Sequence, residues 1–312
     1  MSQEKNLSDS DLEKKAMSDS LANFYKQREN KDQEVNSDDN QVTGKIPPKI
    51  NMESPDNFQS RMQVETDPDL VIGYENVDLP SKGLFYPNGL NKVKIEYLTS
   101  RDEDILTTPS LIQDGTVLDV ILQRKIKTPN VDVSKLLTGD KNALILFLRA
   151  SSYGHEYEVQ VRDPRNDKQF SQVVDLTKLK SKELTEHPNE QGLFEVKIPM
   201  RKKNVKFRLL TSGEEDKLVK RAQEIQEAYG HEYSEYSTMK LKAHIVEIEG
   251  RTDRSYIERF VDAMPVLDTL TIRKKILVVS PDIDMSYEFK TKDGHKFKAS
   301  LTVGVDFFFP SL

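Results

Sequence analysis

The stretch that decides the fold occurs twice, as VKIEYLTSRDED at residues 93–104 and as VKFRLLTSGEED at residues 205–216. In each copy, alternating apolar residues predict a short strand with one buried face. The pattern Ser-x-x-Glu then predicts a capping box, in which side chains and main-chain amides at the start of a helix satisfy each other. The sequence therefore predicts two related strand-to-helix units. The expected capping residues are Ser100 with Glu103 and Ser212 with Glu215.

Composition narrows the class of protein. The chain has 312 residues, a net charge of −6 and no cysteine. An acidic balance argues against a nucleic-acid partner, because phosphate contacts need clustered Lys and Arg. Without cysteine there are no disulfides, no Cys-based zinc sites and no thiol catalysis, which suits a reducing cytoplasm. No apolar run approaches the roughly 18 residues of a spanning helix, and the polar start is unlike a signal peptide, so we expect no membrane span.

Residues 1–66 differ from the rest of the chain. They contain 13 acidic and 9 basic residues and only three aromatic ones, so they bury too little apolar surface to offset chain entropy. We expect a disordered acidic tail. A candidate amphipathic helix spans 10–26, where it is either a transient helix or a segment that docks onto a partner. Its apolar face includes Leu21, Phe24 and Tyr25.

The remaining sequence predicts an α+β fold, with short antiparallel strands and hairpins among short helices. We expect a first α+β module at 67–192, with a helical insert and a hairpin, and a second at 193–312 that ends in a hairpin. The pentapeptide YGHEY also occurs twice, at 153–157 and 229–233. Its offset differs from that of the longer repeat, which favours a similar helix exit used twice over a simple duplication.

No constellation of catalytic residues stands out. His155-Glu156 and His231-Glu232 lack the second His that a zincin needs four residues on, and Asp282-x-Asp284 lacks the Gly and distal Glu of a calcium loop. No nucleophile motif and no phosphate-binding loop is present. We therefore expect no catalytic residue, no cofactor and no metal.

Two kinds of feature suggest protein contacts. Short basic clusters at 200–203 and 273–275 are either solvated surfaces or contacts for an acidic protein. Three consecutive Phe on a strand would place rings on both faces, so one face must be covered by a helix of this chain or by another protein. The candidate partner-contact residues of the folded region are Phe85, Tyr86, Phe307, Phe308 and Phe309.

Several motifs together resemble a known family. LPSKGLFYP at 79–87, VKIEYLTSRDEDILT at 93–107 and LIQDGTVLD at 111–119 resemble baseplate hub proteins of T-even-type contractile-tailed bacteriophages. The ending VDFFFP is similar to an FFWP-type ending of that family, with Phe309 in the place of Trp. The resemblance covers residues 70–312.

The resemblance also implies a difference. Such proteins are expected to carry Cys-x-x-Cys pairs, as zinc ribbons, in hairpins like 161–170 and 288–297. Asp163-Pro164-Arg165-Asn166 and Lys290-Thr291-Lys292-Asp293 stand there instead. We expect the hairpins to persist without metal and to be stabilised by packing.

The resemblance implies a non-enzymatic structural component of the virion tail baseplate, at or near its central hub, made in the host bacterial cytoplasm. Its partners would be other baseplate or hub proteins. A transient assembly factor that is not retained in the virion is the alternative. A hub-associated cell-wall hydrolase is a further alternative, although no pair of carboxylates stands out for it. A host-cell adaptor unrelated to phage is the third class.

Overall fold

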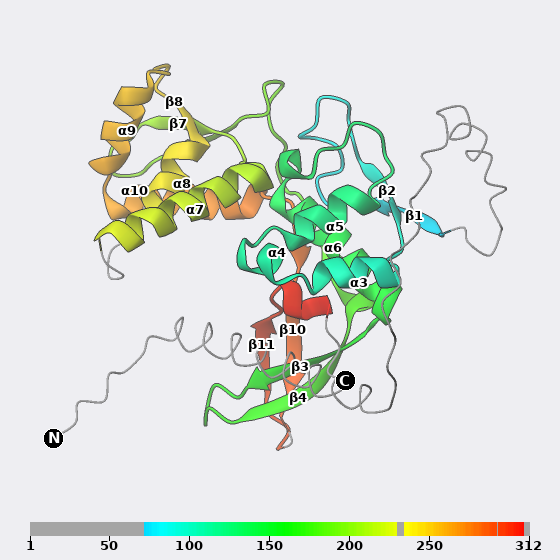
Figure 1. Cartoon of the computed structure of the whole chain (residues 1–312). Coiled ribbons are helices and arrows are strands. Elements are labelled where there is room, and N and C mark those ends of the chain that lie inside the picture. Colours follow the sequence, from blue (N-terminus) through cyan, green and yellow to red (C-terminus); the bar gives the residue numbers. More distant parts are fainter. Residues whose placement is uncertain (1–71, 230–233, 292, 309–312) are drawn as a thin grey trace, which may run out of the picture. The chain divides into compact units, whose positions relative to one another are not determined.

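The computed structural model describes residues 72–229, 234–291 and 293–308 (Figure 1). The predicted tail at 1–66 and its candidate helix at 10–26 lie outside this part. Residues 66–312 form one compact unit, which contains both predicted modules. No helix in the described ranges is long and apolar enough to cross a membrane.

The first copy of the repeat forms the strand-to-helix unit that its sequence predicts. Antiparallel pairing places Val77 opposite Val93, and the second strand then enters a run of short helices. Val93 and Ile95, which alternate along that strand, are both fully buried. The elements are β1 (Tyr74–Asp78), β2 (Lys92–Glu96), α3 (Ser100–Leu106), α4 (Pro109–Gln113), α5 (Val117–Lys125), η2 (Val133–Lys135) and α6 (Thr138–Tyr153).

The predicted hairpin after Gly154 is present. Gly154 ends α6 with φ of 86°, a conformation that glycine adopts without a steric penalty. Two antiparallel strands follow, with Val161 opposite Phe170. The elements are β3 (Glu156–Arg162), β4 (Gln169–Asp175), η3 (Leu176–Lys178) and β5 (Lys180–Ser181).

The second copy sits in a three-stranded antiparallel sheet of order β6-β7-β8. Its β7 leads into the long α7, as β2 leads into α3. Three further helices follow, and β9 pairs back with β5. The elements are β6 (Phe194–Lys197), β7 (Asn204–Phe207), α7 (Ser212–Tyr229), α8 (Tyr236–His244), β8 (Ile245–Ile248), α9 (Arg254–Asp262), α10 (Val266–Val279) and β9 (Ile283–Asp284).

The C-terminal hairpin consists of β10 (Ser286–Lys290) and β11 (Lys296–Ser300). The sequence predicted a strand for the three consecutive Phe residues, and for Phe307 and Phe308 this is wrong. β11 ends at Ser300, and Val305–Phe308 form a turn of 3₁₀ helix, η4, in which the Phe307 amide donates to the Gly304 carbonyl. The turn allows two adjacent Phe side chains to enter the same core, which an extended strand would prevent.

Buried apolar residues form three clusters. The largest contains residues of the helical insert, the C-terminal hairpin and η4. Residues that are far apart in the sequence, such as Leu144 and Phe289, therefore share one core. A second lies among β7, β8, α9 and α10. A small third cluster joins Leu137 to Phe194 and Phe207. Thus both copies of the repeat are anchored by buried strand residues, and the α+β prediction is confirmed.

Candidate functional site

The two strand-to-helix corners use the same cap, one residue earlier than predicted. Thr99, not Ser100, precedes α3, and its amide donates to Asp102 Oδ2 at 2.8 Å. In the second corner the Thr211 amide donates to Glu214 Oε2 at 2.9 Å, and the Glu214 amide donates to Thr211 Oγ1 at 3.3 Å. The capping box is therefore Thr-x-x-acid in both copies. Because Thr and Ser are adjacent and both can cap, the sequence pattern fitted either register.

The acidic residues of the two capping boxes, Asp102 and Glu214, each form an ion pair with a basic side chain. Burial alone raises the pKa of Asp102, but hydrogen bonds from Lys125 and Thr99 outweigh it and lower the pKa. Lys125 Nζ lies 2.8 Å from Asp102 Oδ2, and both side chains are almost fully buried. At the second corner, hydrogen bonds from the Arg208 guanidinium lower the pKa of Glu214 to about 2. Each corner is thus a cap and an ion pair at once.

The residues predicted as caps have other partners. Ser212 is buried, and its hydroxyl donates to the Val133 carbonyl at 3.0 Å. Glu215 accepts a hydrogen bond from Thr138 Oγ1 at 2.6 Å and pairs with Lys240 at 2.7 Å. Glu103 accepts from the Tyr153 hydroxyl at 2.9 Å, whereas Ser100 is exposed. Glu103, Ser212 and Glu215 therefore attach the corners to neighbouring elements.

Tyr86 lies in a buried polar cluster of this chain. Its hydroxyl donates to Asp140 Oδ2 at 2.5 Å and accepts from the Leu137 amide at 2.9 Å. Asp140 also accepts from the Ser81 amide at 2.9 Å, and burial raises the pKa of its carboxyl. Phe85 packs against Phe194, with ring centroids 6.0 Å apart. The prediction that Phe85 and Tyr86 contact a partner stays untested, but both have contacts within the chain.

The C-terminal Phe residues fill the chain's own core. Phe307 and Phe308 are each 1% exposed, which overturns their prediction as partner contacts. Their position depends on Arg149, which is also buried and whose Nε donates to the Phe307 carbonyl at 2.6 Å. Arg149 donates a second hydrogen bond to the Gly154 carbonyl at 3.0 Å. The candidate contacts that lie outside the described residues are Leu21, Phe24, Tyr25 and Phe309.

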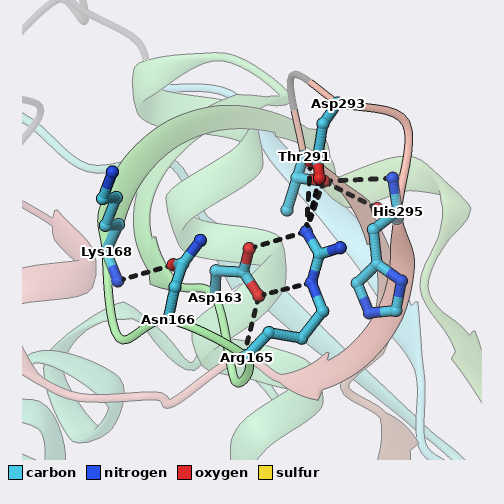
Figure 2. Close-up of polar contacts among 7 residues, drawn as sticks. All are labelled: Asp163, Arg165, Asn166, Lys168, Thr291, Asp293 and His295. Atoms are coloured by element: carbon cyan, nitrogen blue, oxygen red, sulfur yellow. Dashed lines mark hydrogen bonds and ion pairs between the residues drawn. The ribbon is translucent and has the colours of Figure 1, made fainter.

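The tips of the two hairpins meet at one arginine (Figure 2). Arg165, in the β3–β4 tip, lies 2.9 Å from Asp163 Oδ2 and 2.8 Å from Asp293 Oδ2, so it bridges two tips that are far apart in the sequence. Thr291 also donates to Asp293, and Asp163 is nearly buried. Hydrogen bonds from Thr291 and Arg165 lower the pKa of Asp293 to about 2.

This arrangement occupies the positions where the resemblance implied zinc-binding cysteines. A guanidinium between two carboxylates supplies fixed, directional hydrogen bonds, and so joins the tips as a shared metal ion would. Below the tips, Phe170 and Phe297 meet edge to face with centroids 6.2 Å apart. Polar and aromatic contacts therefore both hold the hairpins together.

The residues considered for metal binding have ordinary roles. His155 and Glu156 are exposed at the start of β3, while His231 and Glu232 lie outside the described residues. Asp284 accepts from the Ser286 amide in a local turn. Across the described part of the chain, no group of three or more His, Asp or Glu residues could hold a metal ion.

One surface that the sequence reasoning missed lies on α10. Five large apolar side chains share its exposed side, and Asp268, Ile272 and Val279 form the buried side. The available signal was a helix with apolar residues on more than one side, so that one buried side cannot cover all of them. We call this surface the α10 face. It consists of Val266, Leu267, Leu270, Leu277 and Val278.

These features define an α+β protein with an exposed apolar helix face, the kind of surface that other proteins cover. Residues 72–309 match the model of a family described as T4 bacteriophage base plate protein. The chain belongs to this family, and it is a phage baseplate protein. This confirms the resemblance in the sequence at the level of the baseplate. Comparison with curated proteins and with solved structures gives no match.

Proposed function

We propose that the chain is a non-enzymatic structural component of the central hub region of a contractile tail baseplate. It is made in the host bacterial cytoplasm and acts by docking onto other baseplate or hub proteins. Membership of the baseplate family supports a location in the tail baseplate. The α10 face supports the mechanism, because it offers an apolar surface to a partner.

The apolar side chains on α10 are the observation that carries the docking proposal. Of the 13 large apolar side chains exposed in the described ranges, five lie on this one helix. Leu277 is 70% exposed and Val266 is 73% exposed. Burying a fully exposed Val or Leu side chain contributes about 1.5–3 kcal/mol, and each of these partly exposed side chains contributes a fraction of that, so a partner that covers several of them gains binding free energy.

The charges on the α10 face indicate the kind of partner surface. Arg273 and Lys274 are exposed on the same side of the helix, between the apolar residues near its two ends. A complementary surface has apolar residues that meet both ends and a carboxylate between them. The two basic side chains would then contribute more to the specificity of binding than to its affinity.

Assembly of baseplates tests the docking role. Leu267→Ser with Leu277→Ser makes the α10 face polar, and Val173→Ser changes a comparably exposed apolar residue on β4. In infected cells that depend on the variant chain, we expect few complete baseplates with the double variant and normal numbers with the control. Circular dichroism and thermal unfolding of both purified proteins check the fold. Normal assembly with a folded double variant would contradict docking through α10.

Mass spectrometry of purified virions separates a component from an assembly factor. We expect this chain in a constant ratio to the other baseplate proteins. If it is abundant in assembling cells and absent from purified virions, the assembly-factor alternative replaces the component.

A further inference from the structure

A cationic hollow lies between the β6–β7 turn and α9. Its volume is about 610 Å³, and half of its lining residues are Arg or Lys, with no carboxylate among those described. It includes Arg201 and Lys203 of the basic cluster at 200–203, which is not part of the α10 face. The hollow is lined by Arg201, Lys203, Tyr256, Arg259, Phe260 and Ala263.

The carboxylates around the hollow already have partners. Asp262 pairs with Lys242 at 2.6 Å, and Glu258 pairs with Arg254 at 2.9 Å. The remaining acids accept hydrogen bonds from main-chain amides: Glu249 from Asn204, Asp253 from Tyr256, and Asp268 from Met200 and Arg201.

The cations of the hollow lack such partners. In the described part of the chain, Arg201, Lys203 and Arg259 form no ion pair. Arg201 and Arg259 donate instead to the main-chain carbonyls of Ala263 and Ser255. Three basic side chains that form no ion pair in the described residues therefore lie close together on one small part of an acidic protein.

The arginines at this surface are also held in place. The buried Asp268 accepts from the Met200 amide at 2.7 Å and from the Arg201 amide at 3.1 Å, which fixes the turn. The Arg201 guanidinium lies 4.7 Å from the centroid of the Phe260 ring. Beside the hollow, Arg251 lies 3.6 Å above Tyr256. Side chains that are ordered before binding lose less conformational entropy when a ligand arrives.

We propose that the cationic hollow binds an acidic segment of a partner protein through its carboxylates. A guanidinium group can donate two parallel hydrogen bonds to one carboxylate, and the contacts of Arg201 with Phe260 and of Arg251 with Tyr256 restrict these side chains before a ligand arrives. Nucleic acid is the weaker fit, because contact with successive phosphates needs basic residues spread along a stripe, whereas these basic residues are confined to one small hollow. This inference rests on the proposed docking role and assigns a partner chemistry to a second surface.

Binding of a fluorescently labelled polyglutamate peptide to the full-length protein tests the proposal. We expect saturable binding that weakens as salt is added. Lys203→Glu with Arg259→Glu should weaken binding by about tenfold or more, since like charges then face the peptide. Lys217→Glu with Lys220→Glu makes the same change in net charge at exposed positions of α7, and binding should remain within about twofold of wild type.

Three outcomes would overturn the proposal. They are absence of polyglutamate binding, equal loss of binding in both charge variants, and tighter binding of a single-stranded DNA of the same length and charge. The apolar variant Leu267→Ser with Leu277→Ser should bind the peptide as wild type does. The cationic hollow and the α10 face can therefore fail separately, one in peptide binding and the other in baseplate assembly.

Discussion

Arg149 donates from Nε to the Phe307 carbonyl at 2.6 Å, across 158 residues of sequence. The guanidinium is buried and lies 5.4 Å from the ring centroid of Tyr157 and 6.0 Å from that of Phe307. Burial lowers the pKa of Arg149, because a charge without water is costly. This one side chain attaches the C-terminal turn to the end of α6.

Removing the Arg149 guanidinium should destabilise the protein. Arg149→Met leaves the buried carbonyl of Phe307 without a donor, at a cost of about 1–3 kcal/mol, and removes the hydrogen bond to the exposed Gly154, which water can replace. Because the variant buries no charge, part of this cost is offset, and we expect urea unfolding to show a loss of about 2 kcal/mol. Arg162→Met, at an exposed arginine of β3, should change stability by less than about 0.5 kcal/mol. Equal stabilities of the two variants would show that η4 is held by packing alone.

Tyr86 should stabilise the fold through the hydrogen bonds of its hydroxyl. Tyr86→Phe keeps the ring but removes the donor to Asp140 and the acceptor for the Leu137 amide. Because both groups are then unsatisfied, we expect a loss of about 2–3 kcal/mol in chemical denaturation. Tyr74→Phe, at an exposed tyrosine, is the matched control and should have little effect. A negligible loss in Tyr86→Phe would indicate that water replaces the hydroxyl.

The adjacent residues Thr211 and Ser212 should act by different routes. Thr211→Ala removes a cap and Ser212→Ala removes the bond to the Val133 carbonyl, each at a cost of about 1 kcal/mol. In double-mutant cycles, Thr211→Ala should couple to Glu214→Ala, whereas Ser212→Ala should add to it independently. Coupling of Ser212 instead of Thr211 would restore the capping register that the sequence suggested.

Arg165 should control the ionisation of Asp293. The Asp293 pKa of about 2 lies below the usual value of about 3.9, so the bridge stabilises the fold above pH about 4 and is lost as the pH falls toward 2. In Arg165→Met, side-chain NMR titration should show a higher Asp293 pKa, while the Thr291 hydroxyl keeps part of the shift. Arg162→Met should leave the pKa unchanged. The same value in wild type and Arg165→Met would exclude the bridge in solution.

His244 should make stability depend on pH near neutrality. Burial lowers its pKa, and its Nδ1 lies 2.7 Å from the Arg208 carbonyl. Below the unfolded value of about 6.5 the unfolded chain binds the proton more readily, so stability is lost as the pH falls through that value. We expect the free energy of unfolding of His244→Asn to depend less on pH than that of wild type between pH 7.5 and 5.5. His187→Gln, at an exposed histidine, should show the same pH dependence as wild type. Equal pH dependence in wild type and His244→Asn would contradict this assignment.

The sequence predicted local elements well because their signals are local. Alternation at Val93 and Ile95 predicted a buried strand face, and Gly154 predicted the end of α6. The caps were placed one residue late, because Thr-x-x-acid overlaps Ser-x-x-Glu in both corners. The α10 face was missed because the apolar residues of a helix can be buried or exposed. Only the elements that pack against the helix in the fold determine which of its sides is exposed.

By itself, the sequence determined the two strand-to-helix corners, most of the helices and hairpins, and the baseplate family. These depend on periodicity, capping and turn residues within a few positions of each other, and on motifs read directly along the chain. The tertiary structure alone decided that Arg165 joins Asp163 to Asp293 across 128 residues, and that Phe307 and Phe308 are covered by this chain. The physical reason is that burial and charge pairing depend on which distant segments pack together, and spacing along the chain carries no record of that choice.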